Sequence, residues 1–107
     1  MTRKDIIGLI GDILTGIDVL LSGPDVPVSS PEWQQLWALR KHLDDQQREL
    51  VAAQIDENTQ GYATGTTKLG AANQQLTASL KDFTKIASTI QAVSTVAGLV
   101  DQLLKSV

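Results

Sequence analysis

The chain has 107 residues, of which 42% are hydrophobic and 20% are charged, and its net charge is −3 at pH 7. This length allows one domain with a modest core, and the ordinary apolar content excludes global disorder. The absence of cysteine excludes disulfides, thiolate nucleophiles and cysteine-based zinc sites, and the absence of a basic cluster excludes the electrostatic footprint of nucleic-acid binding.

The N-terminal segment superficially resembles a signal peptide, because Arg3 and Lys4 precede an apolar run. However, Asp5, Asp12 and Asp18 interrupt the run, and no small-x-small cleavage site follows. No stretch of the chain is long and apolar enough for a membrane-spanning helix. We expect a cytoplasmic protein, or one exported without a classical signal peptide.

Residues 4–21 are expected to form the first helix, with Thr2 as N-cap and Asp5 completing a capping box. Its Ile and Leu residues fall on one face, opposite Asp12 and Asp18, and Val19 is the exception. This face is predicted to pack on the C-terminal part of the chain, around Ile90, Val93, Ala97, Val100 and Leu104. The alternative is a helix lying on a membrane surface, which the aspartates of the polar face disfavour.

Residues 30–58 are expected to form the second helix, after a connector that contains Pro24 and Pro27. Ser29 or Ser30 is the predicted N-cap, and Pro31 suits the first turn. Trp33 and Trp37 stand at i and i+4 and form one aromatic patch. This patch either closes the core over the first helix or faces a partner, and it also suits a membrane interface.

Residues 55–67 are expected to contain a helix–helix turn, because they are rich in weak helix formers. The opposing observation is that Ile55 and Tyr62 are in heptad phase with Leu69, as if the helix continued. The segment that starts at Asp56 resembles the opening of a calcium-binding loop. Its twelfth position is Thr67, where such a loop needs a bidentate glutamate, so we expect no metal here.

Residues 67–106 are expected to form one long, coiled-coil-like helix, because two apolar series recur at heptad spacing. The first series is Leu69, Leu76, Phe83, Ile90, Ala97 and Leu104, and the second is Ala72, Ser79, Ile86, Val93, Val100 and Val107. The predicted fold is therefore all-α, an antiparallel three-helix bundle in a single domain spanning residues 1–107. The excess length of the third helix predicts self-association or a protein partner.

Residues that suit catalysis are sparse. His42 shares one helix face with Asp45 and Glu49, which is an incomplete ligand set and an incomplete catalytic set. No Ser-His-Asp arrangement is visible. We therefore expect no enzyme, no cofactor and no metal.

The functional hypothesis is a non-enzymatic protein–protein interaction module of the adaptor, inhibitor or secretion-system accessory type, which binds through apolar helix seams. The candidate partner-binding residues are Trp33, Trp37, Leu69, Leu76 and Phe83. The alternatives are a membrane-active amphipathic hairpin and an oligomerising structural coiled coil. The expected partner is a protein or a second copy; nucleic acid is excluded, and membrane contact is not favoured.

Overall fold

The computed structural model describes residues 1–80 and 86–106, and these residues form helices and no strand. In this part of the chain the helices are α1 (Arg3–Ser22), α2 (Pro31–Ala52), α3 (Gln60–Leu80) and α4 (Ile86–Ser106). The predicted all-α class is confirmed. The predicted three-helix bundle is wrong, because α3 and α4 stand where one long helix over residues 67–106 was expected. Residues 81–85 of that predicted helix lie outside the described residues.

The start of α1 follows the predicted capping chemistry. Thr2 Oγ1 accepts a hydrogen bond of 3.1 Å from the Asp5 backbone N–H, and Asp5 Oδ2 accepts one of 2.8 Å from the Thr2 backbone N–H. The pair satisfies two N–H groups that a helix end leaves without intrahelical partners. Local sequence therefore fixes where α1 begins.

The turn expected within residues 55–67 is present, but it lies earlier, over residues 53–59. The Asn58 N–H donates to Asp56 Oδ1 at 3.0 Å, which offers the backbone an alternative to helix. Thr59 Oγ1 accepts from the Tyr62 N–H at 3.2 Å and opens α3. The second helix therefore ends at Ala52 rather than at residue 58.

The heptad phase changes between α3 and α4. The buried residues Tyr62, Leu69 and Leu76 follow one heptad series along α3. Continuing that series through α4 would select Ile90, Ala97 and Leu104, of which the small Ala97 is buried and the two large residues are only partly buried. The buried series of α4 is displaced by one residue, to Thr89, Val96 and Leu103, with Val93 and Val100 beside it. Each helix presents its own stripe to the core, so a shared spacing does not imply one continuous helix.

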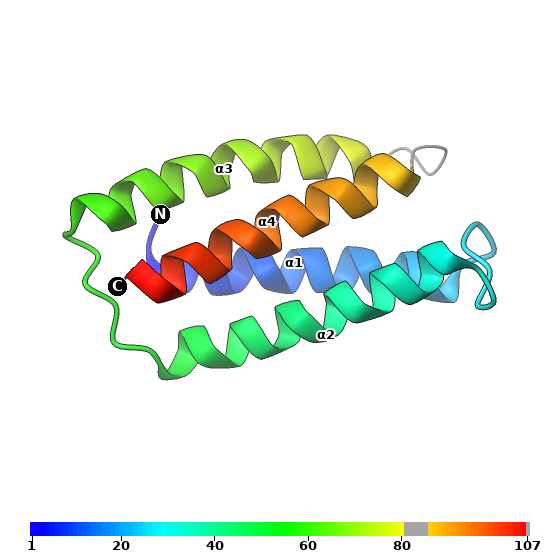
Figure 1. Ribbon diagram of the computed structural model, residues 1–107, viewed down its shortest axis with the longest axis horizontal. Helices are drawn as coiled ribbons and strands as arrows, with labels where there is room; N and C mark the ends of the chain where they lie inside the picture. Colours follow the sequence, from blue (N-terminus) through cyan, green and yellow to red (C-terminus); the bar gives the residue numbers. More distant parts are fainter. Residues whose placement is uncertain (81–85, 107) are drawn as a thin grey trace.

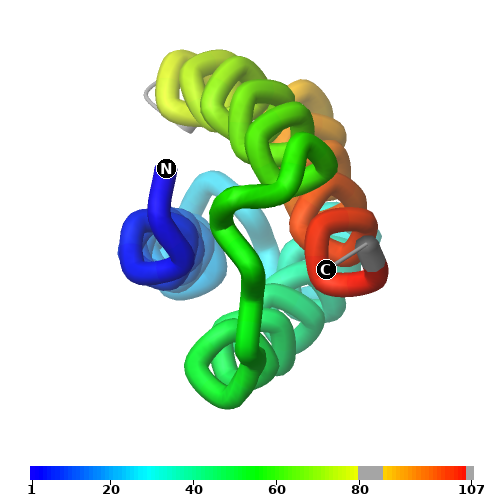
Figure 2. The backbone as a smooth tube through the Cα atoms, turned by 90° about the vertical axis from the view of Figure 1, so that its left-hand side faces the viewer, coloured from blue at the N-terminus to red at the C-terminus, as the bar shows by residue number. Residues whose placement is uncertain are grey.

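The bundle consists of two antiparallel hairpins, α1–α2 and α3–α4 (Figure 1). Viewed from the end, the α2–α3 connector crosses the bundle, and α1 and α4 occupy opposite corners (Figure 2). The closely packed pairs are α1–α2, α2–α4 and α3–α4. The first helix was predicted to pack on the 90–104 face, but the helix that it packs against closely is α2. Its buried residues share the core cluster with Val93, Ala97 and Val100 of α4.

One apolar cluster fills the space between the hairpins. The first helix supplies much of it, and its six buried residues are Ile6, Ile10, Ile13, Leu14, Ile17 and Leu20. Val19, the predicted exception, is 56% exposed. Burial of each large aliphatic side chain contributes about 1.5–3 kcal/mol before entropy is counted, so α1 is a core helix of this bundle.

The N-terminus is tied to the end of the bundle where α2 connects to α3. The Tyr62 hydroxyl donates to the Met1 carbonyl at 2.6 Å, and the Arg3 backbone N–H donates to Glu57 Oε1 at 2.6 Å. The Arg3 guanidinium also donates to the Ala53 carbonyl. These bonds position the first turn of α1 beside α3.

Candidate functional site

Two of the predicted partner-binding residues are in the core. Leu69 is 1% exposed and Leu76 is 0% exposed, both on the buried face of α3. A partner cannot reach them unless the bundle opens. Phe83, the third residue of that predicted seam, lies outside the described residues.

The predicted tryptophan patch is present, but its two members differ in accessibility. The rings of Trp33 and Trp37 stack with centroids 5.9 Å apart and an interplanar angle of 20°. Trp33 Nε1 donates to the Leu21 carbonyl at 3.0 Å, so this indole covers the end of α1. Trp37 is 41% exposed, and the Arg40 guanidinium carbon lies 6.0 Å from its ring centroid. Trp33 thus fits the core interpretation, and only Trp37 presents a large surface.

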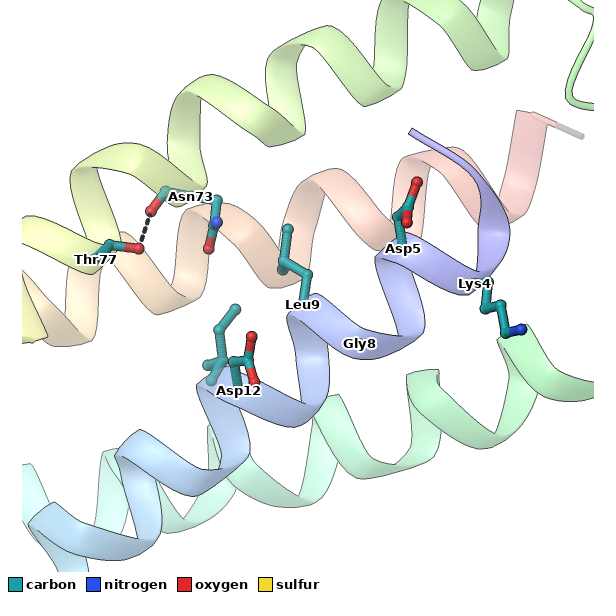
Figure 3. Close-up of a pocket in the computed structure, with 8 residues that line it drawn as sticks. Lys4, Asp5, Gly8, Leu9, Asp12, Asn73 and Thr77 are labelled. Atoms are coloured by element: carbon teal, nitrogen blue, oxygen red, sulfur yellow. Dashed lines mark hydrogen bonds between the residues drawn. The ribbon is translucent and has the colours of Figure 1, made fainter.

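A groove of about 580 Å³ lies between α1 and α3. Figure 3 shows Asp5, Leu9 and Asp12 pointing from α1 toward α3, while Asn73 and Thr77 line the opposite wall. Ile13, which is 2% exposed, forms the deep part of the floor. The groove therefore combines an apolar floor with polar edges.

The chemistry of the facing residues explains why this seam stays open. Helices close on one another when apolar side chains interdigitate and leave water. Here α1 presents Gly8 and Asp12, and α3 presents Asn73 and Thr77. Closing the seam would remove water from a carboxylate and an amide and would add little apolar burial beyond Leu9, because Ile13 is already buried.

The edges of the groove carry negative charge. Hydrogen bonds from the Thr2 backbone and hydroxyl lower the pKa of Asp5 below its ordinary value. Asp12 is exposed, and within residues 1–80 and 86–106 it makes no hydrogen bond or ion pair. The Lys4 side chain also borders the groove, but its ammonium end points away from Asn73 and Thr77 (Figure 3). The N-terminal ammonium also lowers the pKa of Asp5, while Asp12 has no ion-pair partner within the described residues.

The face of His42 that the sequence suggested as a weak metal or base site is organised differently. His42 Nε2 lies 2.8 Å from Asp101 Oδ2 on α4, whereas Asp45 pairs with Arg48 at 3.8 Å. No group of three His, Asp or Glu side chains with metal-binding geometry occurs among the described residues. His42 therefore helps to join α2 to α4.

A buried amide completes this junction. Gln46 is 1% exposed, and its Nε2 donates to the Ala97 carbonyl at 2.8 Å and to Asp101 Oδ1 at 2.7 Å. Partial burial raises the pKa of Asp101, but the hydrogen bonds from Gln46 and His42 outweigh it, so the pKa lies below its ordinary value. The arrangement fixes the register of α2 against α4.

The groove residues were absent from the sequence-based candidates, although the sequence carries a signal for them. Asp5 and Asp12 stand at i and i+7 on the first helix. On α3, the groove residues Asn73 and Thr77 stand at i and i+4. Each set of residues alone is typical of a solvated helix face. The two sets line a groove only because α1 and α3 place them opposite each other.

Comparison of this chain with protein-family models, curated proteins and solved structures gives no match. Among the described residues, no helix is long and apolar enough to cross a membrane.

Proposed function

We propose that this chain is a non-enzymatic protein–protein interaction module whose partner occupies the groove between α1 and α3. The observation that carries the proposal is the open seam itself. The other three neighbouring pairs of helices are closely packed, and the grooves along α3 and α4 are smaller, at about 370 and 430 Å³, than the one of about 580 Å³ between α1 and α3. Leu9 offers apolar area there, and a concave site with a few polar groups suits recognition.

The polar groups at the edges suit the binding of another polypeptide. The carboxylate of Asp12 accepts hydrogen bonds, and the amide of Asn73 both donates and accepts them. Neither side chain makes a hydrogen bond within the described residues, so both are available to a partner. These groups give orientation and specificity, while the apolar floor gives contact area.

The apolar heptad series that was expected to bind a partner is buried, and this moves the expected binding site to the groove. Leu69 and Leu76 pack inside the bundle, so the uncovered long helix that motivated self-association is absent from the described chain. The apolar face of α1 is likewise in the core, and a membrane-active hairpin would have to expose it. The groove needs no such opening.

Two glycine substitutions provide a matched test. A Cβ built on Gly8, which lines the groove, or on Gly98, which lies on α4, meets no atom within 4 Å. Gly8→Trp should therefore fill the groove, and Gly98→Trp should add the same ring elsewhere, with both variants keeping the wild-type fold by circular dichroism.

The measurement is capture of proteins from the native host by the wild type and both variants, followed by reconstitution with the purified binding protein. We expect the wild type and Gly98→Trp to bind it and Gly8→Trp to lose it. Equal binding by all three, or no binding protein at all, contradicts the proposal.

A further inference from the structure

The groove between α1 and α3 has the length and the floor that an added helix needs. Asp5 and Asp12 are separated by about 10.5 Å along α1, at 1.5 Å rise per residue. Leu9 lies between them and points toward α3 (Figure 3). No atom lies within 4 Å of a Cβ built on Gly8, so a second backbone can approach α1 closely. A helix laid along α1 would meet acidic, apolar and acidic positions in turn, at helical spacing.

The charge of the groove distinguishes between a second copy of the chain, an anionic membrane and a basic helix as its occupant. Asp5 and Asp12 both face the groove, Asn73 and Thr77 are neutral, and the one lining cation, Lys4, points its ammonium end away from Asn73 and Thr77 (Figure 3). The net charge of the chain is −3. A second copy that docked groove to groove would bring its own Asp5 and Asp12 into the interface, and like charges placed together oppose association. An anionic membrane surface is disfavoured for the same reason. Cationic side chains complement this groove.

We propose that the occupant is an amphipathic helix of a partner protein that places Lys or Arg at i and i+7 over Asp5 and Asp12. The long aliphatic stems of these side chains cover apolar surface while their charged ends reach the carboxylates. An aliphatic residue between them contacts Leu9. Asn73 and Thr77 then offer an amide and a hydroxyl to the other side of the helix. This inference rests on the proposed function, since it names the partner of the same groove.

The probe is a pair of synthetic helical peptides that share an Ala/Leu face and differ only in carrying Lys or Glu at i and i+7. Binding is measured by fluorescence anisotropy, and its position by amide chemical shifts of the isotopically labelled protein. We expect the Lys peptide to bind, with weaker binding at higher salt, and to shift the amide signals of Gly8, Asp12 and Asn73. The Glu peptide should not bind.

A charge reversal tests the contact directly. Asp12→Lys should weaken binding of the Lys peptide roughly three- to tenfold, because an exposed ion pair is converted into a repulsive pair. The difference in affinity between the Lys and Glu peptides should narrow, because each then makes one attractive and one repulsive pair. Asp25→Lys changes the net charge equally on the exposed α1–α2 connector and should leave both peptides unaffected. Equal binding of both peptides, or equal effects of the two substitutions, would overturn the inference.

The remaining outcomes separate this inference from the proposed function. If the Lys peptide fails to bind while Gly8→Trp still abolishes capture of the native partner, the groove is the site and its occupant is not a basic helix. If Gly8→Trp retains capture, the proposed function fails whatever the peptides do. If wild-type light scattering shows a dimer that Gly8→Trp abolishes, the occupant is a second copy and the basic-helix inference is wrong. Binding to anionic vesicles that Gly8→Trp abolishes would also overturn it.

Discussion

Gln46 Nε2 on α2 donates a hydrogen bond of 2.7 Å to Asp101 Oδ1 on α4, while Oε1 of the same amide is buried and has no partner within the described residues. A buried acceptor without a partner costs about 1–3 kcal/mol, which offsets what the two donated bonds contribute. The polar junction between α2 and α4 thus specifies register at little net gain in stability.

Replacement of the Gln46 amide by an apolar group of similar size should therefore cost little. We expect Gln46→Leu to leave the free energy of unfolding within about 1 kcal/mol of the wild type. Gln46→Ala leaves a cavity and should lower it by about 2 kcal/mol or more. Urea unfolding of both variants measures the difference. A large loss in Gln46→Leu would mean that the hydrogen bonds carry net stability.

The carboxylate of Asp101 should make stability depend on pH in the acidic range. Its pKa is lower in the folded chain than the ordinary value of 3.8, so the unfolded chain binds more protons as the pH falls. The contribution is present in full above the ordinary value and is lost as the pH falls through the folded pKa. Because the side chain is 40% exposed, solvent screening limits it to about 0.2–1 kcal/mol.

The matched substitutions for this test are Asp101→Asn and Asp25→Asn. We expect Asp101→Asn to unfold at a lower urea concentration than the wild type at pH 7, with the gap closing in the acidic range. Asp25 is exposed on the α1–α2 connector, and its substitution should have no such effect. A gap for Asp101→Asn that is constant with pH would show that its carboxylate charge is not involved.

The burial of α1 predicts unequal effects of the same charge on its two faces. Ile10 is 0% exposed, whereas Thr15 lies on the exposed face of α1. Ile10→Asp would bury an unpaired carboxylate and should lower the free energy of unfolding by more than about 3 kcal/mol, or prevent folding. Thr15→Asp should change it by less than about 1 kcal/mol. Similar melting curves for the two variants would place α1 outside the core.

The two tryptophans should differ in what they contribute to stability. Trp33→Ala removes a partly buried indole and its hydrogen bond to the Leu21 carbonyl, and we expect a loss of about 3 kcal/mol. Trp37→Ala removes a more exposed ring and its stacking, for which about 1 kcal/mol is expected. Chemical unfolding followed by circular dichroism compares them. Equal losses would contradict the separate roles of the two rings.

Two helical glycines test the close approach of α3 and α4. A Cβ on Gly65 would lie 2.8 Å from Leu103 Cδ1, and Leu103 is only 2% exposed. A Cβ on Gly98 meets nothing within 4 Å. Gly98→Ala should therefore raise the free energy of unfolding by about 0.5–1 kcal/mol, while Gly65→Ala should lose that gain to repacking. Equal stabilisation of both variants would show that Leu103 moves freely.

The local features of this fold were predictable from the sequence. The Thr2–Asp5 capping box and the amphipathic face of residues 4–21 placed the first helix almost where the structure has it. These signals act within a few residues, because a cap needs only the first turn and a helical face repeats with every turn. The all-α class follows from the same short-range rules.

Tertiary structure decided what those helices face. The heptad spacing of Leu69 and Leu76 agrees both with one long helix and with two helices packed against each other. The one-residue shift to Val96 and Leu103 is meaningful only once the core is known.

The groove depends on tertiary structure even more than the heptad series does. Asp12 on α1 and Asn73 on α3 are ordinary polar residues of two helix faces, and they form one site because the packing of α1 on α2 and of α4 on both α2 and α3 leaves those faces opposite each other. Residues so far apart in sequence are brought together by burial of the apolar faces, and no local pattern records that pairing.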